Sequence, residues 1–204
     1  MTPETFDQDI RDGASLGQIA AFLDELDDST RQRAVNSLGK TAQARLYDIA
    51  ADAEPLTLGD FVPPQETALT PVAHRGLNTL PLPTAGKRFT KWMARGGDGT
   101  VIGYNNSPFG PLIGPGYFVL RESPDESAER GAIVVDYYAV PDGPVPGDWP
   151  WVRANWVGLQ FFVYHQTRDY MRRVSQHVTI GSAFKWDKVE LGSYFVLCRE
   201  TAEA

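Results

Sequence analysis

The sequence predicts an α+β fold with three parts. These are short N-terminal helices, a packed proline-rich connector, and a C-terminal antiparallel β-sheet curled into a barrel or half-barrel with one helix packed on it. Three observations support this: helical apolar spacing early in the chain, a cluster of prolines in the middle, and β-rich segments joined by hairpin-length turns afterwards. We therefore divide the 204 residues into 1–53, 54–86 and 87–204.

Residues 1–53 are expected to form three short helices. The first begins after Ser15, which has the spacing of a capping box with Gln18. The second ends before Gly39, and the third follows Thr41. Helices this short are marginal alone in water, so we expect them to pack on one another and on the rest of the chain.

Residues 54–86 carry six prolines within about 30 residues. Proline fixes φ and removes a backbone donor, so no regular element is expected in this segment. The segment also contains many leucines and Phe61, more apolar surface than a free linker needs. We therefore expect it to lie against the body of the protein.

Residues 87–204 show strand patterns. In 88–94 the alternation places Phe89 and Lys91 on one face and Trp92 on the other, and Asp98-Gly99 is a hairpin signal. Further strands are expected at 101–105, 117–121, 132–140, 156–165 and 188–199. Turns of hairpin length between strands favour antiparallel pairing.

Residues 167–178 fit two interpretations. As a helix, this segment would be capped by Thr167 and would bury a stripe that includes Met171 and Val174. As a strand, it would place Met171, Arg173 and His177 on one face. We favour the helix, because its apolar stripe is cleaner.

Charge and composition exclude several classes of protein. The net charge of −7 lies in residues 1–60, which hold 12 acidic and 5 basic residues, and this argues against nucleic-acid binding. Basic residues beside aromatics at 87–92 and 168–173 are read as solvated surfaces. The single cysteine, Cys198, permits no internal disulfide. With no secretory signal and no apolar run of about 20 residues, we expect a cytoplasmic protein without a membrane span.

No catalytic or metal motif is present in the sequence. His74, His165 and His177 do not have the spacing of a metal pair, so no metal site is predicted. Phosphate-binding and serine-hydrolase motifs are missing, and the sequence names no cofactor. Cys198 lies among apolar strand residues and is interpreted as a core residue.

Asp136 is the most notable titratable residue, because it lies within the apolar strand AIVVDYYAV. A partly buried carboxylate can have a raised pKa and act as a general acid or base. The alternative is an ion pair with Arg121 or Lys91. If the protein is an enzyme of unknown reaction, Asp136 or His177 would be its acid or base.

The aromatic residues favour a ligand-binding function. Nineteen of the 23 aromatic side chains follow residue 85, where they form either a large core or the lining of a cavity. Our leading hypothesis is a cavity for a small, partly apolar and possibly anionic ligand. Tyr104, Asn105 and Tyr117 would orient it, and Arg173 and His177 would meet a negative group.

The loop between Asn105 and Tyr117 contains Gly114-Pro115-Gly116, which allows a sharp turn and close approach by a partner. Its apolar tip, which includes Leu112, needs cover from the helices, the connector, a ligand or a second copy in a homodimer. A second hypothesis comes from the concentration of negative charge in residues 1–60. It is a non-enzymatic interaction module that presents the acidic N-terminal helices to a protein partner.

Overall fold

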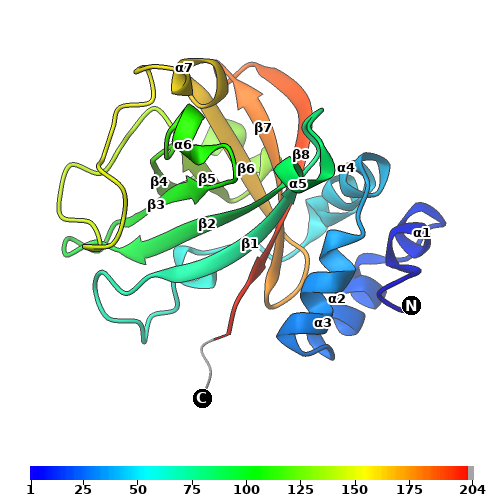
Figure 1. Ribbon diagram of the computed structural model, residues 1–204. Helices are drawn as coiled ribbons and strands as arrows, with labels where there is room; N and C mark the ends of the chain where they lie inside the picture. Colours follow the sequence, from blue (N-terminus) through cyan, green and yellow to red (C-terminus); the bar gives the residue numbers. More distant parts are fainter. Residues whose placement is uncertain (202–204) are drawn as a thin grey trace.

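The computed structural model describes residues 1–201 and shows a closed barrel of eight antiparallel strands with four helices against one side (Figure 1). Each strand pairs with the next along the chain, and the last pairs with the first. The predicted α+β fold with a barrel is confirmed. The strands are β1 (Val72–Asn78), β2 (Arg88–Arg95), β3 (Val101–Asn106), β4 (Phe118–Glu122), β5 (Ile133–Asp136), β6 (Thr167–Arg173), β7 (Val178–Lys185) and β8 (Val189–Arg199).

The four N-terminal helices are α1 (Phe6–Arg11), α2 (Leu16–Asp24), α3 (Asp28–Asn36) and α4 (Lys40–Ile49). The predicted capping box of Ser15 and Gln18 begins α2. Short helical turns lie in the connecting segments: α5 (Thr84–Lys87), α6 (Gly110–Ile113), α7 (Gln160–Val163), and the 3₁₀ turns η1 (Ala50–Asp52), η2 (Leu58–Asp60) and η3 (Asp125–Arg130). None of the helices among residues 1–201 combines the length and apolar character needed to cross a membrane.

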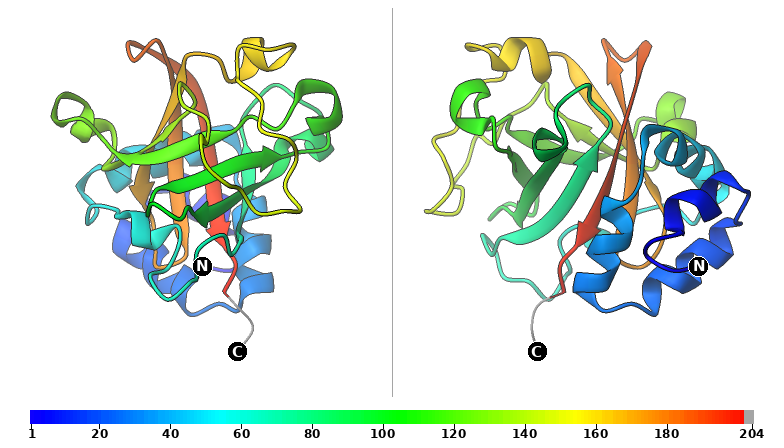
Figure 2. Two further views of the ribbon diagram at one scale, coloured as in Figure 1. Left: turned by 90° about the vertical axis from the view of Figure 1, so that its left-hand side faces the viewer. Right: turned by 45° about the vertical axis from the view of Figure 1, so that its right-hand side comes forward.

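The helices share a hydrophobic core with the outer face of the barrel. Figure 2 shows α1–α4 gathered on one side, next to β8. Outward-facing Val178 and Ile180 of β7 and Val196 of β8 are fully buried in this core. The helical residues in the same core include Phe6, Ile10, Ile19, Leu23, Val35 and Leu46. Helices that are marginal alone therefore gain their stability from burial against the sheet.

The first part of the connector, residues 56–62, closes one end of the barrel. Leu56, Phe61 and Val62 are buried together with the interior side chains of that end, which include Met93, Val101, Leu120, Ile133 and Met171. His74 points into the same region, and its Nε2 lies 2.9 Å from the carbonyl oxygen of Phe61. Apolar side chains therefore fill most of this end of the barrel.

The structure corrects three expectations. The 167–178 segment is not a helix: residues 167–173 form β6, whose two edges are hydrogen-bonded to β5 and β7 in the closed barrel. The expected strand at 156–165 is a turn followed by α7. The connector, expected to hold no regular element, contains β1, which occupies the proline-free stretch after Pro71.

Candidate ligand site inside the barrel

A cavity of about 240 Å³ lies inside the barrel, at the end opposite residues 56–62. Its mouth is apolar and is formed by segments far apart in the sequence, namely the loop before α5, helices α6 and α7, and β8. In Figure 1, α6, α7 and the hairpin between β7 and β8 lie at this same end. The apolar residues of the mouth are Leu80, Leu82, Phe109, Ile113, Val163 and Leu191.

The floor of the cavity is polar and centres on Lys91 of β2, whose side chain is 2% exposed. Its ammonium group donates to Asn105 Oδ1 at 2.9 Å and to the hydroxyl of Tyr137. The carboxylate of Asp169 on β6 lies 3.6 Å from Lys91 Nζ. Asn105 Nδ2 in turn lies 3.1 Å from the Tyr137 hydroxyl, so the four side chains form one network.

Strand alternation explains why these side chains meet. Lys91 of β2 is directly opposite Asn105 of β3, so both point inward. On β6, Thr167, Asp169 and Met171 alternate with outward-facing residues, and this places Asp169 across the interior from Lys91.

Burial shifts the pKa of each titratable group in this network. Desolvation lowers the pKa of Lys91 to about 8, although the charge of Asp169 opposes the change. Desolvation also raises the pKa of Asp169, against the opposing charge of Lys91. The pKa of the Tyr137 hydroxyl is raised well above its usual value, first by desolvation and then by Asp169. Lys91 and Asp169 carry opposite charges as an ion pair, so the pair adds no net charge to the floor.

Aromatic rings surround the ammonium group. Lys91 Nζ lies 4.8 Å from the ring centroid of Phe118, 4.9 Å from that of Phe195 and 5.0 Å from that of Tyr137. Each ring face attracts a cation, and the attraction is stronger where water is excluded. These contacts offset part of the cost of burying the charge.

The Gly114-Pro115-Gly116 loop holds Asn105 in place. The backbone N–H of Asn105 donates to the carbonyl of Pro115 at 2.8 Å, and Asn105 Nδ2 donates to the carbonyl of Gly116 at 2.9 Å. Gly116 N–H donates to Gln160 Oε1 of α7 at 2.8 Å. Gly116 has a φ of +54°, and a Cβ there would come within 2.4 Å of the Tyr164 ring. The predicted close approach is thus to α7 and to Tyr164 just after it, on the cavity wall.

One polar group of the cavity wall has no partner. The hydroxyl of Thr167 is buried and forms no hydrogen bond with any of residues 1–201. Four other described residues also have a buried polar side-chain atom without a hydrogen bond, and Thr167 is the one of the five that lines the cavity. The other four are Gln43, Asn155, Arg168 and Thr179. Thr167 and Asp169 are two positions apart on β6 and both line the cavity, so Thr167 lies near the polar floor.

Of the five predicted ligand-binding residues, only Asn105 reaches the cavity. Tyr104 and Tyr117 point outward and pack with Trp149, with ring centroids of Tyr104 at 5.6 Å from Tyr117 and 5.0 Å from Trp149. The Tyr117 hydroxyl donates to the carbonyl of Pro150 at 2.5 Å. These aromatic side chains cover the outside of β3 and β4.

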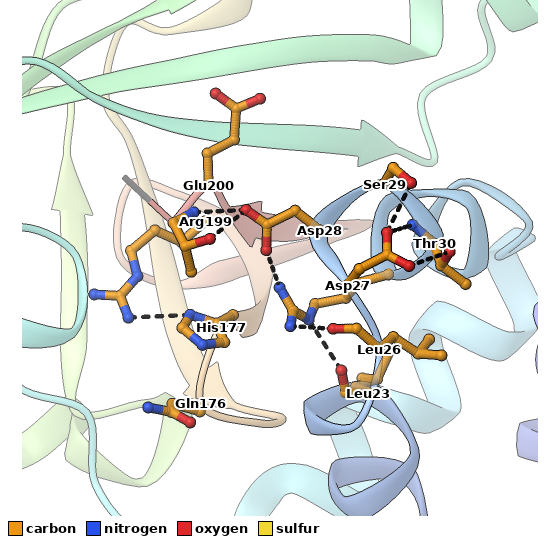
Figure 3. A network of polar contacts seen from close by, with 12 residues as sticks. Leu23, Leu26, Asp27, Asp28, Ser29, Thr30, Gln176, His177, Arg199 and Glu200 are labelled. Carbon is orange, nitrogen blue, oxygen red and sulfur yellow. Dashed lines mark hydrogen bonds and ion pairs between the residues drawn. The ribbon is translucent and has the colours of Figure 1, made fainter. Parts of the chain in front are cut away.

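Arg173 and His177 lie away from the cavity. Arg173 forms two 2.8 Å hydrogen bonds with the carboxylate of Asp60 in the connector. Figure 3 shows His177 beside Arg199, near the N-terminal helices, and Arg199 donates to His177 Nδ1 at 3.2 Å. Burial, together with the charges of nearby arginines, lowers the pKa of His177. Neither side chain can touch a molecule on the cavity floor.

Asp136 faces the outside of the barrel, as in the ion-pair alternative. Its carboxylate lies 3.3 Å from Arg168 Nε and 3.7 Å from Arg121 Nε. Neither Asp136 nor His177, the two proposed acid or base residues, lines the cavity. Within residues 1–201, no three His, Cys, Asp or Glu side chains are grouped as a metal site.

Sequence reasoning missed most of the floor, namely Lys91, Tyr137, Tyr164, Thr167 and Asp169. A signal did exist for three of them. The alternation in β2 places Lys91 on the same face as Phe89, and an ammonium on an aromatic face indicates an interior position. The strand interpretation of 167–178 would have placed Thr167 and Asp169 on the same face as Met171, but the helix interpretation separated them.

Comparisons of the chain with protein-family models, with curated proteins and with solved structures found no significant match. The functional interpretation therefore depends on the chemistry of the site itself. A β-barrel with these aromatic clusters is compatible with ligand binding.

Proposed function

We propose that the protein binds a small, electrically neutral and largely apolar molecule with a hydroxyl or carbonyl group at one end. The observation that carries this proposal is the combination of a neutral polar floor with an apolar mouth in one cavity. Eight-stranded barrels have an interior just wide enough to be filled by side chains or to hold one small ligand.

The charge of the floor supports a neutral ligand. Among residues 1–201, Lys91 and Asp169 are the only charged residues that line the cavity, and their charges are opposite. An anionic ligand would have to displace Asp169 from Lys91, and a cationic ligand would have to do the reverse. Each would leave a buried charge without its partner, which costs several kcal/mol. A hydroxyl or carbonyl can bond to Thr167 without breaking the pair.

The volume sets the size of the ligand. A protein cavity of about 150 Å³ can hold benzene, so about 240 Å³ has room for roughly ten non-hydrogen atoms. The apolar mouth suits the chain or ring of such a molecule, and its polar end would point toward the floor. Octanol is a suitable probe because it has this size and one hydroxyl.

The test is a calorimetric titration of octanol into the wild-type protein and two matched variants. Thr167→Val removes the orphan hydroxyl of the cavity wall and should weaken binding about fivefold, since one hydrogen bond contributes about 1 kcal/mol. Thr179→Val removes a buried orphan hydroxyl that does not line the cavity, and it should leave affinity unchanged.

A third variant blocks the cavity. Ala183 lines it, so Ala183→Phe should abolish octanol binding while the protein still unfolds cooperatively. Octanol binding that is unaffected by Ala183→Phe would place the ligand elsewhere. The absence of binding by the wild-type protein would refute the proposed function for this ligand class.

A further inference from the structure

We propose that Lys91 forms a covalent imine with an apolar aldehyde in this cavity, so that the barrel acts as a reversible covalent binder of aldehydes. This inference rests on the proposed function, which it narrows to one class of ligand. Three features of the site support it: the position of Lys91, the groups around its amine, and the apolar mouth through which an aldehyde can reach that amine.

The position of Lys91 is unusual for a lysine. The chain has five lysines, and the other four, Lys40, Lys87, Lys185 and Lys188, are exposed or half-buried. Lys91 alone lies inside the barrel at the base of a cavity that opens to solvent through an apolar mouth. An aldehyde that enters with its chain toward the mouth would bring its carbonyl carbon to the polar floor.

The amine can supply the neutral form that attack on a carbonyl requires. A pKa of about 8 leaves roughly a tenth of Lys91 neutral at pH 7, whereas an ordinary lysine is neutral in well under a thousandth of molecules. The titratable groups near Lys91 are Asp169, Tyr137, Tyr164 and His74. Burial lowers the pKa of His74 to about 4, so this residue is neutral at pH 7 and adds no competing charge.

The reaction needs only the aldehyde, the amine of Lys91 and the proton-carrying groups beside it. Neutral Nζ adds its lone pair to the carbonyl carbon, and the carbonyl oxygen becomes a hydroxyl by taking a proton. The C–O bond then breaks, the C=N bond forms, and the oxygen leaves as one water molecule with both hydrogens of the amine. Asp169 and the Tyr137 hydroxyl lie beside Nζ and can relay these protons.

Asp169 also stabilises the product. The imine nitrogen then takes back the proton that Lys91 released before the attack. The protonated imine keeps the positive charge of Lys91 in nearly the same place, and the carboxylate 3.6 Å away remains its counter-ion. The aromatic rings of Phe118, Tyr137 and Phe195 would attract that cation as they attract the ammonium. Imine formation therefore preserves the electrostatic balance of the floor, which binding of a free anion or cation would disturb.

The experiment treats the full-length protein with one equivalent of octanal and sodium cyanoborohydride at pH 7, followed by intact mass measurement and peptide mapping. The expected result is one octyl group on Lys91, added at least about tenfold faster than on any other lysine. Octanol at saturating concentration should slow labelling of Lys91 and leave labelling of the surface lysines unchanged.

Lys91→Arg keeps the charge next to Asp169 but cannot form an imine, so its specific label should be lost. If that variant fails to fold, the competition by octanol in the wild-type protein still decides the question. Labelling spread evenly over Lys40, Lys87, Lys185 and Lys188, or no label on Lys91, would overturn the inference.

The two proposals fail in different ways. If octanol binds in the cavity but octanal leaves Lys91 unlabelled, the ligand-binding function stands and the imine is wrong. If octanol does not bind and labelling of Lys91 is also absent, both are wrong.

Discussion

Replacing Asp169 with asparagine should destabilise the protein by an amount that depends strongly on pH. The change removes the counter-ion of Lys91 and leaves a buried ammonium without a partner. The folded variant avoids the buried charge if Lys91 releases its proton. The free energy of that proton release therefore sets how much stability the substitution removes.

The magnitude follows from the pKa of Lys91, about 8 in the wild-type protein. Releasing its proton costs about 1.4 kcal/mol for each pH unit below 8. The free energy of unfolding should therefore fall by about 3 kcal/mol at pH 6, by about 1.4 kcal/mol at pH 7, and by little at pH 8. Between pH 6 and 8 the unfolded variant binds one proton more than the folded variant, so its stability rises with pH.

Urea unfolding followed by tryptophan fluorescence at pH 6, 7 and 8 measures this effect. Asp136→Asn is the matched control: it removes a carboxylate whose partners, Arg121 and Arg168, stay charged throughout, so its penalty should not vary with pH. A loss in Asp169→Asn that is equal at all three pH values would refute the reasoning, as would a loss below about 0.5 kcal/mol at pH 6.

Three further predictions concern other parts of the molecule. Gly116→Ala should lower the free energy of unfolding by about 1–3 kcal/mol and weaken octanol binding, because φ is +54° and the new methyl group would meet the Tyr164 ring. Equal unfolding midpoints and equal octanol affinities would contradict this. Burial raises the pKa of the Cys198 thiol to about 11. At pH 8 iodoacetamide should therefore alkylate this thiol at least about tenfold more slowly in the folded protein than in urea. Similar rates would show that the thiol is accessible. Deleting residues 1–53 should give a chain that aggregates, since Val178, Ile180 and Val196 would each lose burial that contributes roughly 1.5–3 kcal/mol to stability. A soluble truncated protein with cooperative unfolding would show that the helices are dispensable.

The fold could be predicted where the signal was local. The capping box of Ser15, the Asp98-Gly99 turn and the alternation in β2 each depend on residues within one element, and each is found in the structure. The register that closes the barrel could not be predicted, because it depends on pairing between β1 and β8. Such long-range pairing leaves no mark within either strand.

The candidate site was harder to predict, because its side chains come from separate strands. Asn105 was identified through its proximity to the glycine-rich loop, which does hold it in place. Lys91 and Asp169 are 78 positions apart in the sequence and meet only after the barrel has closed. The same loop also predicts Tyr104 and Tyr117 as ligand-binding residues. Their side chains instead lie on the outer face of the barrel, where they pack against Trp149.

The pairing of β1 with β8 has a consequence for how the chain acquires its structure during synthesis. The helices and β1 are made early, but their partner β8 leaves the ribosome more than 100 residues later, as the contact between Arg75 and Glu200 illustrates. Until then the apolar side chains of the helices have no sheet to cover them. Chains with such late contacts fold slowly, and their folding intermediates expose apolar surface that promotes aggregation. We expect the nascent chain to depend on chaperones until the last strand emerges.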